Sequence, residues 1–281
     1  MGESSLKTIL VHIDDSDQSA HRLKVAIQWA LDASAHLIGL YLVPGPELPP
    51  SVAALLPADF VDTLQRDMGA AQHAAEQRFR SSASSAGLAR VEWRAPAGPP
   101  AAAAVEHGRC ADLFVLGQRN PDDATPFADE LILTALLSTG RPLLIVPHIG
   151  IRAMPGQKVL IAWDDRREAA RAVADALPML VRAKEVSVIT YASDEETSAD
   201  VARSTTRLRS WLQDHGIAAR VNGYEAAGGA VGESLLSLAA DRGCDLIVMG
   251  GYGHPRLREV VLGGVTQTIL ASMTVPVLMS H

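Results

Sequence analysis

Residues 245–268, the glycine segment, read DLIVMGGYGHPRLREVVLGGVTQT. Its first part, Leu246 to Gly250, is a short apolar run that ends in glycine, which is typical of a buried parallel strand. The glycines that follow permit backbone conformations that a Cβ would exclude. They are Gly250, Gly251 and Gly253. The segment therefore begins as a strand and continues as a glycine turn.

The second part of the glycine segment is basic and leads into a helix. Its basic side chains are His254, Arg256 and Arg258. Two further glycines, Gly263 and Gly264, then precede the run VTQTILA, which starts with Val265 and Thr266 and has the pattern of a helix start. Free N–H groups and the positive end of a helix dipole favour an anion, so this arrangement predicts a phosphate site. A glycine-rich structural turn is the alternative.

Length and composition indicate a globular protein of two domains. The chain has 281 residues, of which 48% are hydrophobic and 20% charged. Domains usually contain roughly 100–200 residues, so two are expected. The net charge of −7 argues against general binding to nucleic acid or to an anionic membrane. A locally basic ligand site is compatible with this charge.

The cysteines, the N-terminal residues and the length of the apolar runs indicate the cellular compartment. Cys110 and Cys244 are the two cysteines, and free thiols in a reducing compartment are favoured over a disulfide. The first residues, MGESSLK, lack the apolar core of a signal peptide. No run of about 18 apolar residues follows, so no transmembrane helix is predicted. The expected localisation is cytoplasmic.

The first half of the chain alternates between apolar strand patterns and helical patterns. Strands are predicted at residues 7–13, 36–43, 91–95, 112–117 and 142–146, and helices at 19–33, 58–82, 101–108 and 131–138. Such alternation is characteristic of a parallel sheet covered by helices on both faces.

The second half repeats this plan. KVLIAWDD at residues 158–165 matches TILVHIDD at 8–15, which places Asp164 over Asp14 (164 − 14 = 150). CDLIVMG at 244–250 matches ADLFVLG at 111–117 (250 − 117 = 133). A repeat of this size predicts two copies of one domain, at residues 1–147 and 158–281, joined by a linker that contains proline and glycine.

These residues together resemble the universal stress protein family. The resemblance rests on a first strand that ends in Asp, a DLIVMG strand, glycines spaced as G-x2-G-x9-G, and a closing V-P-V strand. It covers nearly the whole chain and identifies it as a tandem member. It implies an α/β fold of two Rossmann-like domains of the adenine nucleotide alpha hydrolase type. Each would be a five-stranded parallel sheet flanked by helices, with the two packed as a pseudo-dimer.

The resemblance also implies an adenine nucleotide site in the second half. The family's glycine pattern falls on Gly250, Gly253 and Gly263, and Gly264 stands where the pattern has Ser or Thr. The side-chain hydroxyl to phosphate is therefore lost, with Thr266 close by. His254 and Arg256 are candidate phosphate contacts in this loop, and a solvated basic loop is the alternative.

Two further positions complete the implied site. Asp164 matches the family acid near the nucleotide, where a carboxylate would meet ribose hydroxyls or hold Mg²⁺ against the phosphates. An Asp that ends a strand and prepares a helix N-terminus is the alternative. Tyr191 and Ala192, near the end of the second strand of this half, line the adenine pocket by resemblance or simply belong to the core.

The first half lacks the glycine segment. After Gly117 the chain reads QRNPDDATP, and alignment of the closing prolines (276 − 142 = 134) places Asp129 and Glu130 over Gly263 and Gly264. Two carboxylates at a helix N-terminus suit the helix dipole but repel a phosphate. We therefore expect this half not to bind ATP in the family manner.

The leading functional hypothesis is a stress-response regulatory protein that binds ATP, with or without Mg²⁺, or a related adenine nucleotide. The alternatives are a nucleotide-free interaction scaffold and an enzyme of adenylyl or phosphoryl transfer. No catalytic or metal-ligating set is predicted, and any ATPase activity should be slow, because no base or arginine finger is evident. The closing strands, 142–146 and 276–279, are expected to pair within the chain, and a homodimer is an open option.

Overall fold

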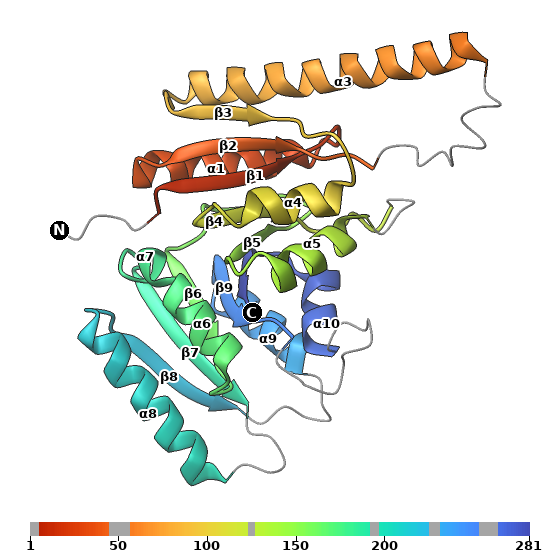
Figure 1. Cartoon of the computed structure of the whole chain (residues 1–281). Coiled ribbons are helices and arrows are strands. Elements are labelled where there is room, and N and C mark those ends of the chain that lie inside the picture. The colour runs from red at the N-terminus through yellow and green to blue at the C-terminus, as the bar shows by residue number, and fades with distance from the viewer. Residues whose placement is uncertain (1–5, 45–56, 123–126, 192–196, 225–230, 253–263) are drawn as a thin grey trace.

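The computed structural model describes residues 6–44, 57–122, 127–191, 197–224, 231–252 and 264–281. Within them, ten strands form one continuous sheet in the order β3-β2-β1-β4-β5-β10-β9-β6-β7-β8 (Figure 1). The strands are β1 (Thr8–Ile13), β2 (His36–Tyr41), β3 (Val91–Arg94), β4 (Leu113–Gly117), β5 (Leu143–Val146), β6 (Lys158–Ala162), β7 (Glu185–Tyr191), β8 (Ala219–Tyr224), β9 (Leu246–Gly250) and β10 (Val277–Ser280).

Helices connect these strands in both halves. They are α1 (Ser19–Ala33), α3 (Ala58–Ser85), α4 (Pro100–Gly108), α5 (Phe127–Ser138), α6 (Arg167–Asp175), α7 (Leu177–Leu180), α8 (Ser198–Asp214), α9 (Val231–Asp241) and α10 (Gly264–Ser272). The helix predicted at 19–33 has the observed bounds. The helices predicted at 101 and 131 begin earlier, at Pro100 and Phe127; Pro100 fits a first helical position, where its missing N–H has no partner to lose.

The strand order has the same form in each half and confirms the predicted fold class. All pairs within the first five strands and within the last five are parallel. At the centre, β5 and β10 pair antiparallel, with Leu144 opposite Leu278. The predicted intramolecular pairing of the closing strands is therefore confirmed. It covers two edges that would otherwise expose unpaired backbone groups.

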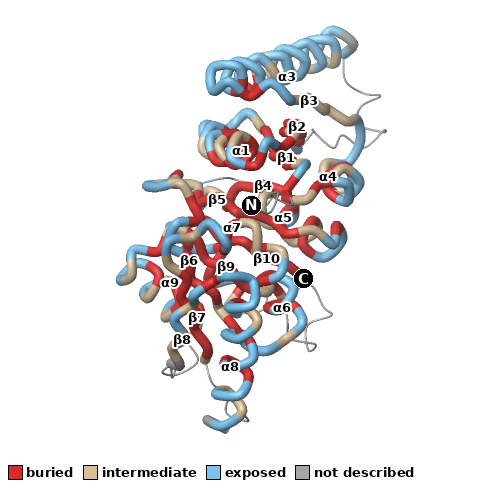
Figure 2. Tube along the Cα trace, turned by 90° about the vertical axis from the view of Figure 1, so that its left-hand side faces the viewer, coloured by how far each residue is buried: buried red, intermediate tan, exposed pale blue. Residues whose placement is uncertain are grey.

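Two hydrophobic cores lie on opposite faces of this sheet. Side chains of α1, α3, α6 and α8 contribute to one, including Leu23, Phe79 and Val173. Side chains of α4, α5, α9 and α10 contribute to the other, including Leu131 and Ile269. Figure 2 shows the consequence: the central strands are buried, the edge strands β3 and β8 are only partly covered, and the outward sides of the helices are exposed. The near-continuous apolar runs of the strands reflect burial on both faces.

The aspartate that precedes the fourth strand of each half has a structural role. The Asp112 carboxylate accepts hydrogen bonds from the backbone N–H groups of Lys7 and Thr8, at 2.8 and 2.9 Å. The Asp245 carboxylate likewise accepts from Gly156 and Lys158, at 2.8 and 3.0 Å. Each aspartate thus fixes the entry of the chain into the neighbouring first strand. This accounts for the repeated Asp-Leu at the start of both strands.

A side-chain contact also joins the two halves. The Gln118 amide donates to the carbonyl oxygen of Leu270 at 2.8 Å, and its own oxygen accepts from the His148 backbone N–H at 3.0 Å. Gln118 is buried, so both contacts are shielded from water. They reinforce the central strand pair, because Leu270 belongs to α10 of the second half.

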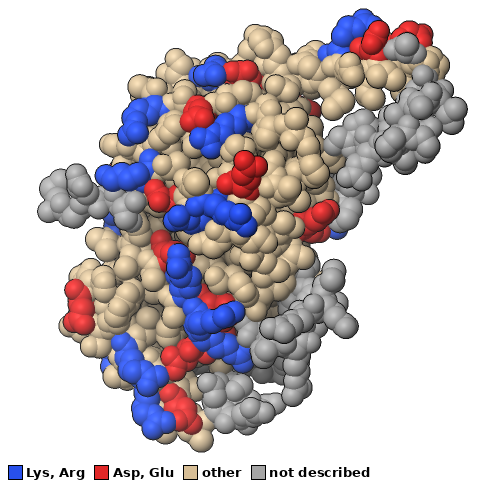
Figure 3. Space-filling model, viewed as in Figure 1, with Lys and Arg blue, Asp and Glu red and all other residues tan. Residues whose placement is uncertain are grey.

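The surface carries mixed charge. In the view of Figure 3, Lys and Arg alternate with Asp and Glu across both halves, without a broad field of one sign. Among the residues that the structure describes, no helix is both long and apolar enough to cross a membrane. Cys110 is exposed and Cys244 is buried, and both are free thiols.

We predict opposite stability effects for two glycine substitutions. A Cβ on Gly39 in β2 would lie 2.9 Å from the Phe79 ring, which is fully buried and packs against Trp93. Gly39→Ala should therefore destabilise the protein by about 1–3 kcal/mol. On the exposed part of α3, a Cβ on Gly69 meets nothing within 4 Å, so Gly69→Ala should stabilise it by about 0.5–1 kcal/mol.

Urea unfolding of the two variants beside the wild type measures both effects. A Gly39→Ala protein as stable as the wild type would show that the Phe79 ring has room to move.

Candidate functional site

The second half has a topological switch point between β6 and β9. Strand β6 pairs with β7 on one side and with β9 on the other, so the connections from β6 and β9 leave toward opposite faces of the sheet. Ligands of open α/β sheets bind outside the carboxyl ends of the strands at such a point. Of the predicted site residues, Ala192, Gly253, His254, Arg256 and Gly263 lie outside the described residues.

Asp164 follows β6 at this edge and is largely exposed. Its side chain is 54% accessible, and its Oδ1 accepts a hydrogen bond from the Arg166 backbone N–H at 3.1 Å. The next residue, Asp165, has a φ of 59°, and its carboxylate accepts from the Arg207 guanidinium at 2.8 Å. The turn after β6 is therefore held by its own carboxylates, and the Asp164 side chain remains accessible to a ligand.

Tyr191 ends β7 at the same edge. Its side chain is half-buried, and the hydroxyl donates to the Ser234 hydroxyl of α9 at 3.0 Å. This bond fixes the ring against the face that α9 covers. Tyr191 therefore lies where sequence placed it, at the end of a strand, with its orientation set by a residue 43 positions away.

The structure gives Gly250 and Gly251 a packing role. A Cβ on Gly250 would lie 2.6 Å from the Ala169 backbone nitrogen, so its absence lets α6 approach β9 closely. A Cβ on Gly251 would lie 2.6 Å from the Leu136 side chain of the first half. Both spaces are filled by protein. A ligand at this edge would therefore meet the backbone of these glycines rather than occupy the room left by their missing side chains.

The start of α10 is the open part of the glycine segment. Gly264 is exposed at the first position of the helix, and a Cβ there would meet no atom of the described residues within 4 Å. Val265 is half-buried. Thr266, in the first turn of α10, is buried, so its hydroxyl is less accessible than the exposed position of Gly264. The helix N-terminus is thus accessible through Gly264.

Tyr252 begins the turn after β9 with a strained backbone. Its φ is 61°, a conformation that side chains other than glycine rarely adopt. The hydroxyl is buried without a hydrogen-bond partner among the described residues. Burial, with a smaller effect of the Asp129 charge, raises the pKa of Tyr252 to about 12. Tyr252 is therefore an uncharged group where the glycine segment borders the first half.

The sequence analysis missed a charged pair at the start of α6. Glu168 is buried beside Gly250, and its Oε1 lies 2.5 Å from the Nε of Arg167. Burial alone would raise the pKa of Glu168, but the Arg167 contact and the backbone N–H of Glu168 hold it below its usual value. The signal for this pair in the sequence is the basic dipeptide directly after Asp164–Asp165.

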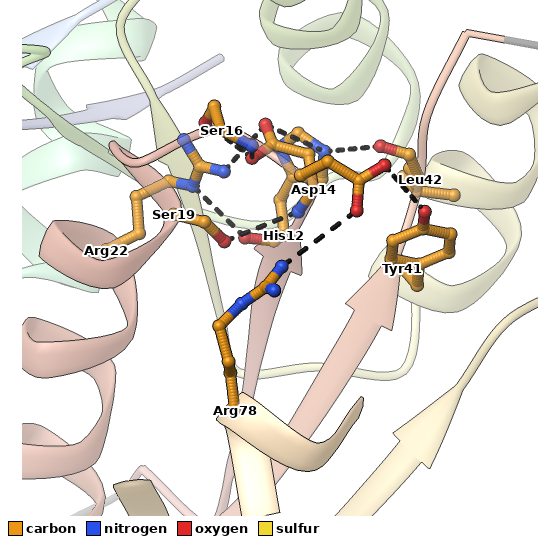
Figure 4. A network of polar contacts seen from close by, with 9 residues as sticks. His12, Asp14, Ser16, Ser19, Arg22, Tyr41, Leu42 and Arg78 are labelled. Atoms are coloured by element: carbon orange, nitrogen blue, oxygen red, sulfur yellow. Dashed lines mark hydrogen bonds and ion pairs between the residues drawn. The ribbon is translucent and has the colours of Figure 1, made fainter. Parts of the chain in front are cut away.

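The corresponding edge of the first half is closed by buried polar groups. Arg22 lies 2.8 Å from the Asp14 carboxylate, and its Nε–H donates to the His12 carbonyl oxygen at 3.1 Å. The His12 Nε2–H donates to the Leu42 carbonyl oxygen at 2.8 Å. Figure 4 shows these side chains converging at the end of β1. Sequence singled out Asp14 but neither His12 nor Arg22.

This packing shifts the pKa values of both titratable groups. Burial, with the nearby Arg22 charge, lowers the pKa of His12 to about 4. Burial would raise the pKa of Asp14, but the charges of Arg22 and His12 and the Ser16 hydroxyl hold it below its ordinary value. At neutral pH the cluster therefore contains a neutral imidazole and an ion pair.

The second half has alanine where the first half has these two side chains. At the offset of 150 residues, His12 corresponds to Ala162 and Arg22 to Ala172. Asp14 is 21% accessible and bound by Arg22, whereas Asp164 is exposed. A Cβ on Gly117 would lie 2.4 Å from Arg22 Nη1, so the guanidinium also fills the space over that glycine. The same acid is thus sequestered in one half and accessible in the other.

In the first half, α5 takes the place that α10 has in the second half, and its first turn is acidic. Asp129 and Glu130 lie in the first turn of α5, as predicted, and Asp129 pairs with Arg119 at 3.4 Å. Among the described residues there is no group of three or more His, Cys, Asp or Glu side chains arranged to hold a metal ion.

Both halves are thus Rossmann-like α/β domains, and a protein-family model matches the second of them. Residues 156–281 match the model of the universal stress protein family. A universal stress protein of Methanocaldococcus jannaschii is 39% identical over 46 residues, which span 16% of this chain and 28% of that protein. The second half therefore belongs to the universal stress protein family.

Solved structures extend this similarity to the fold of the whole chain. A universal stress protein from Archaeoglobus fulgidus DSM 4304 has a TM-score of 0.76 at 18% identity, with 98% of each chain covered. A putative universal stress protein from Pseudomonas aeruginosa UCBPP-PA14 has a TM-score of 0.61 at 17% identity, covering 99% of this chain and 94% of its own. At these identities the likeness concerns the fold. With a family domain in the second half, the chain has the form of a tandem member.

We predict that His12 makes the protein less stable in mild acid. In the unfolded chain this histidine takes up its proton near pH 6.5, whereas the folded protein resists protonation down to about pH 4. The stabilisation that comes from neutral His12 is thus fully present above the pKa of this histidine in the unfolded chain. It is lost as the pH falls toward the pKa of His12 in the folded protein. The whole difference corresponds to roughly 3 kcal/mol.

Urea unfolding between about pH 7 and about pH 4.5 should show a shallower loss of stability for His12→Gln than for the wild type. His73→Gln, at an exposed histidine of α3, serves as control and should keep the wild-type slope. Equal slopes for His12→Gln and the wild type would contradict the buried, neutral state of His12.

Proposed function

We propose that this chain is a tandem universal stress protein whose second half binds ATP, with or without Mg²⁺, or a related adenine nucleotide. The observation that carries the proposal is the contrast between the two carboxyl edges. The second half presents an exposed Asp164 and an open helix start at Gly264. The first half, built on the same topology, has its acid bound by Arg22.

The start of α10 supports the placement of phosphate. The free N–H groups of a helix N-terminus and its positive dipole end favour an anion, and no side chain in the described part of the chain lies within 4 Å of a Cβ built on Gly264. The residues present therefore fit a phosphate group. Gly263, Gly253, His254 and Arg256 belong to the same proposed site through the family's glycine pattern.

The other end of the site would hold the nucleoside. Asp164 has an accessible carboxylate suited to ribose hydroxyls or to a Mg²⁺ ion shared with the phosphates. Tyr191 is held at the end of β7 by Ser234, and with Ala192 it would border the base. We assign these roles by position at the switch point, which is where α/β sheets bind ligands.

The first half supports a stoichiometry of one nucleotide per chain. Asp129 and Glu130 occupy the first turn of α5, where they would repel a phosphate. Freeing Asp14 for a ligand would leave the buried Arg22 unpaired, which is costly. The proposed role of this half is therefore structural, through the central strand pair.

A nucleotide-free scaffold is the second candidate function. Gly264 favours it, because the hydroxyl expected at this position is missing and Thr266, the nearby hydroxyl in the first turn of α10, is buried. The two candidates differ in one measurable property, which is whether an adenine nucleotide binds at all.

We predict that substitutions at Gly264 change ATP affinity in opposite directions. Gly264→Ser adds a donor worth about 0.5–1.5 kcal/mol, so ATP should bind roughly two- to tenfold more tightly. Gly264→Asp places a carboxylate in the same exposed space, as in α5 of the first half, and should weaken ATP binding by about tenfold or more. Isothermal titration measures both.

Mass spectrometry of ligand released from freshly purified protein, followed by titration with ATP, tests the proposal itself. Adenine nucleotide near one per chain, reduced in Gly264→Asp, supports a site in the second half. Absence of nucleotide together with absence of binding on titration would reject the proposal in favour of the scaffold. Circular dichroism of the variants controls for folding, which neither substitution should disturb, since Gly264 is exposed.

A further inference from the structure

Each half places an arginine and a carboxylate beside the glycine that ends its fourth strand. In the first half, Arg22 lies over Gly117 and pairs with Asp14 at 2.8 Å. In the second half, a Cβ on Gly250 would lie 2.8 Å from the Glu168 Cβ, and Glu168 pairs with Arg167 at 2.5 Å. The two pairs are built from different positions of α1 and α6, so they are not copies of each other.

The two pairs differ in which partner, the arginine or the carboxylate, is the more buried. In the first half the guanidinium is inside, with the Arg22 side chain 4% accessible. In the second half the carboxylate is inside, with Glu168 7% accessible, and the Arg167 side chain is 80% accessible. The first pair therefore closes its edge of the sheet, whereas the second holds a cation in solvent at the edge.

The buried carboxylate fixes the position of that cation. Arg167 and the backbone N–H of Glu168 offset the effect of burial and keep the Glu168 pKa below its usual value, so the side chain is charged at neutral pH. The contact uses the Nε–H of Arg167. A guanidinium has five N–H donors, and those on the two terminal nitrogens are suited to a second, bidentate acceptor such as phosphate.

The position of the pair relates it to the site above. Arg167 is the first residue of α6, three positions after Asp164, and Glu168 touches the glycine from which the glycine segment leaves the sheet. The cation and the accessible acid thus lie in one turn, at the switch point between β6 and β9.

We propose that Arg167, positioned by Glu168, binds a phosphate group of the nucleotide and makes the second-half site select phosphorylated nucleotides over the free nucleoside. This inference rests on the proposed function. It adds a specificity-determining residue from the β6–α6 turn to a phosphate site otherwise made of backbone N–H groups. Its distinguishing feature is charge selectivity, which a purely structural ion pair would not produce.

Isothermal titration of ATP and of adenosine into Arg167→Gln tests this selectivity. Loss of a charge-assisted contact should weaken ATP binding by about tenfold and leave adenosine affinity unchanged. Arg171→Gln is the matched control, because Arg171 lies on the same helix, pairs with Asp175 at 2.8 Å and carries the same charge. The Arg171→Gln variant should bind ATP within about twofold of the wild type, since an exposed charge that does not touch the nucleotide is screened by solvent and salt. Arg167→Lys, which keeps the charge without the bidentate geometry, should fall between wild type and Arg167→Gln.

The outcomes separate this inference from the proposed function. Wild-type ATP affinity in Arg167→Gln, or equal weakening in Arg167→Gln and Arg171→Gln, would overturn the assignment while leaving a nucleotide site in place. Equal weakening of ATP and adenosine in Arg167→Gln would also overturn it, because the side chain would then support the site's structure. A wild-type protein that binds neither ligand would reject the proposed function and this inference with it.

Discussion

The antiparallel pairing of β5 with β10 is the contact on which the architecture depends. Each five-stranded sheet would end at a fully buried, apolar strand with unpaired backbone groups, and an exposed edge of this kind invites association. Pairing the two edges satisfies the backbone and joins the cores on both faces of the sheet. Gln118 reinforces this junction with buried hydrogen bonds. The two halves therefore share one continuous sheet and are not independent domains joined only by a linker.

Much of this fold was predictable, because strands buried on both faces leave continuous apolar runs that glycine and aspartate terminate. The strand that ends at Gly250 and the helix from Ser19 to Ala33 are examples. The pairing of the closing strands was predicted from the family resemblance and from the need to cover exposed edge strands. The reason for Gly250 was not accessible, because the close approach of α6 is a tertiary contact with Ala169 that no local pattern encodes.

The charged side chains at the two edges show the limit of such reasoning. Charged side chains such as Arg22 and Glu168 are rarely buried, and a buried charge is recognised only when its partner and its neighbours are known. Arg22 is buried because Gly117 leaves room for it and Asp14 neutralises it. The sequence indicated correctly that the first half had diverged from the glycine pattern. It could not show that the divergence extended to a polar cluster with His12 at its centre.

The antiparallel centre has a geometric consequence. Within each half the strands are parallel, so their carboxyl ends lie together. Because β5 and β10 pair antiparallel, the carboxyl ends of the two halves lie at opposite ends of the sheet. They are separated by about the length of a strand, which is roughly 15 Å for four or five residues. Asp14 and Asp164, which follow β1 and β6, therefore lie at opposite ends of the sheet, although contacts such as that of Gly251 with Leu136 still cross between the halves. The first half can therefore differ from the second in the polar groups that follow β1 and still contribute β5 to the central pair, because the paired strands and the turns after β1 and β6 are different parts of the chain.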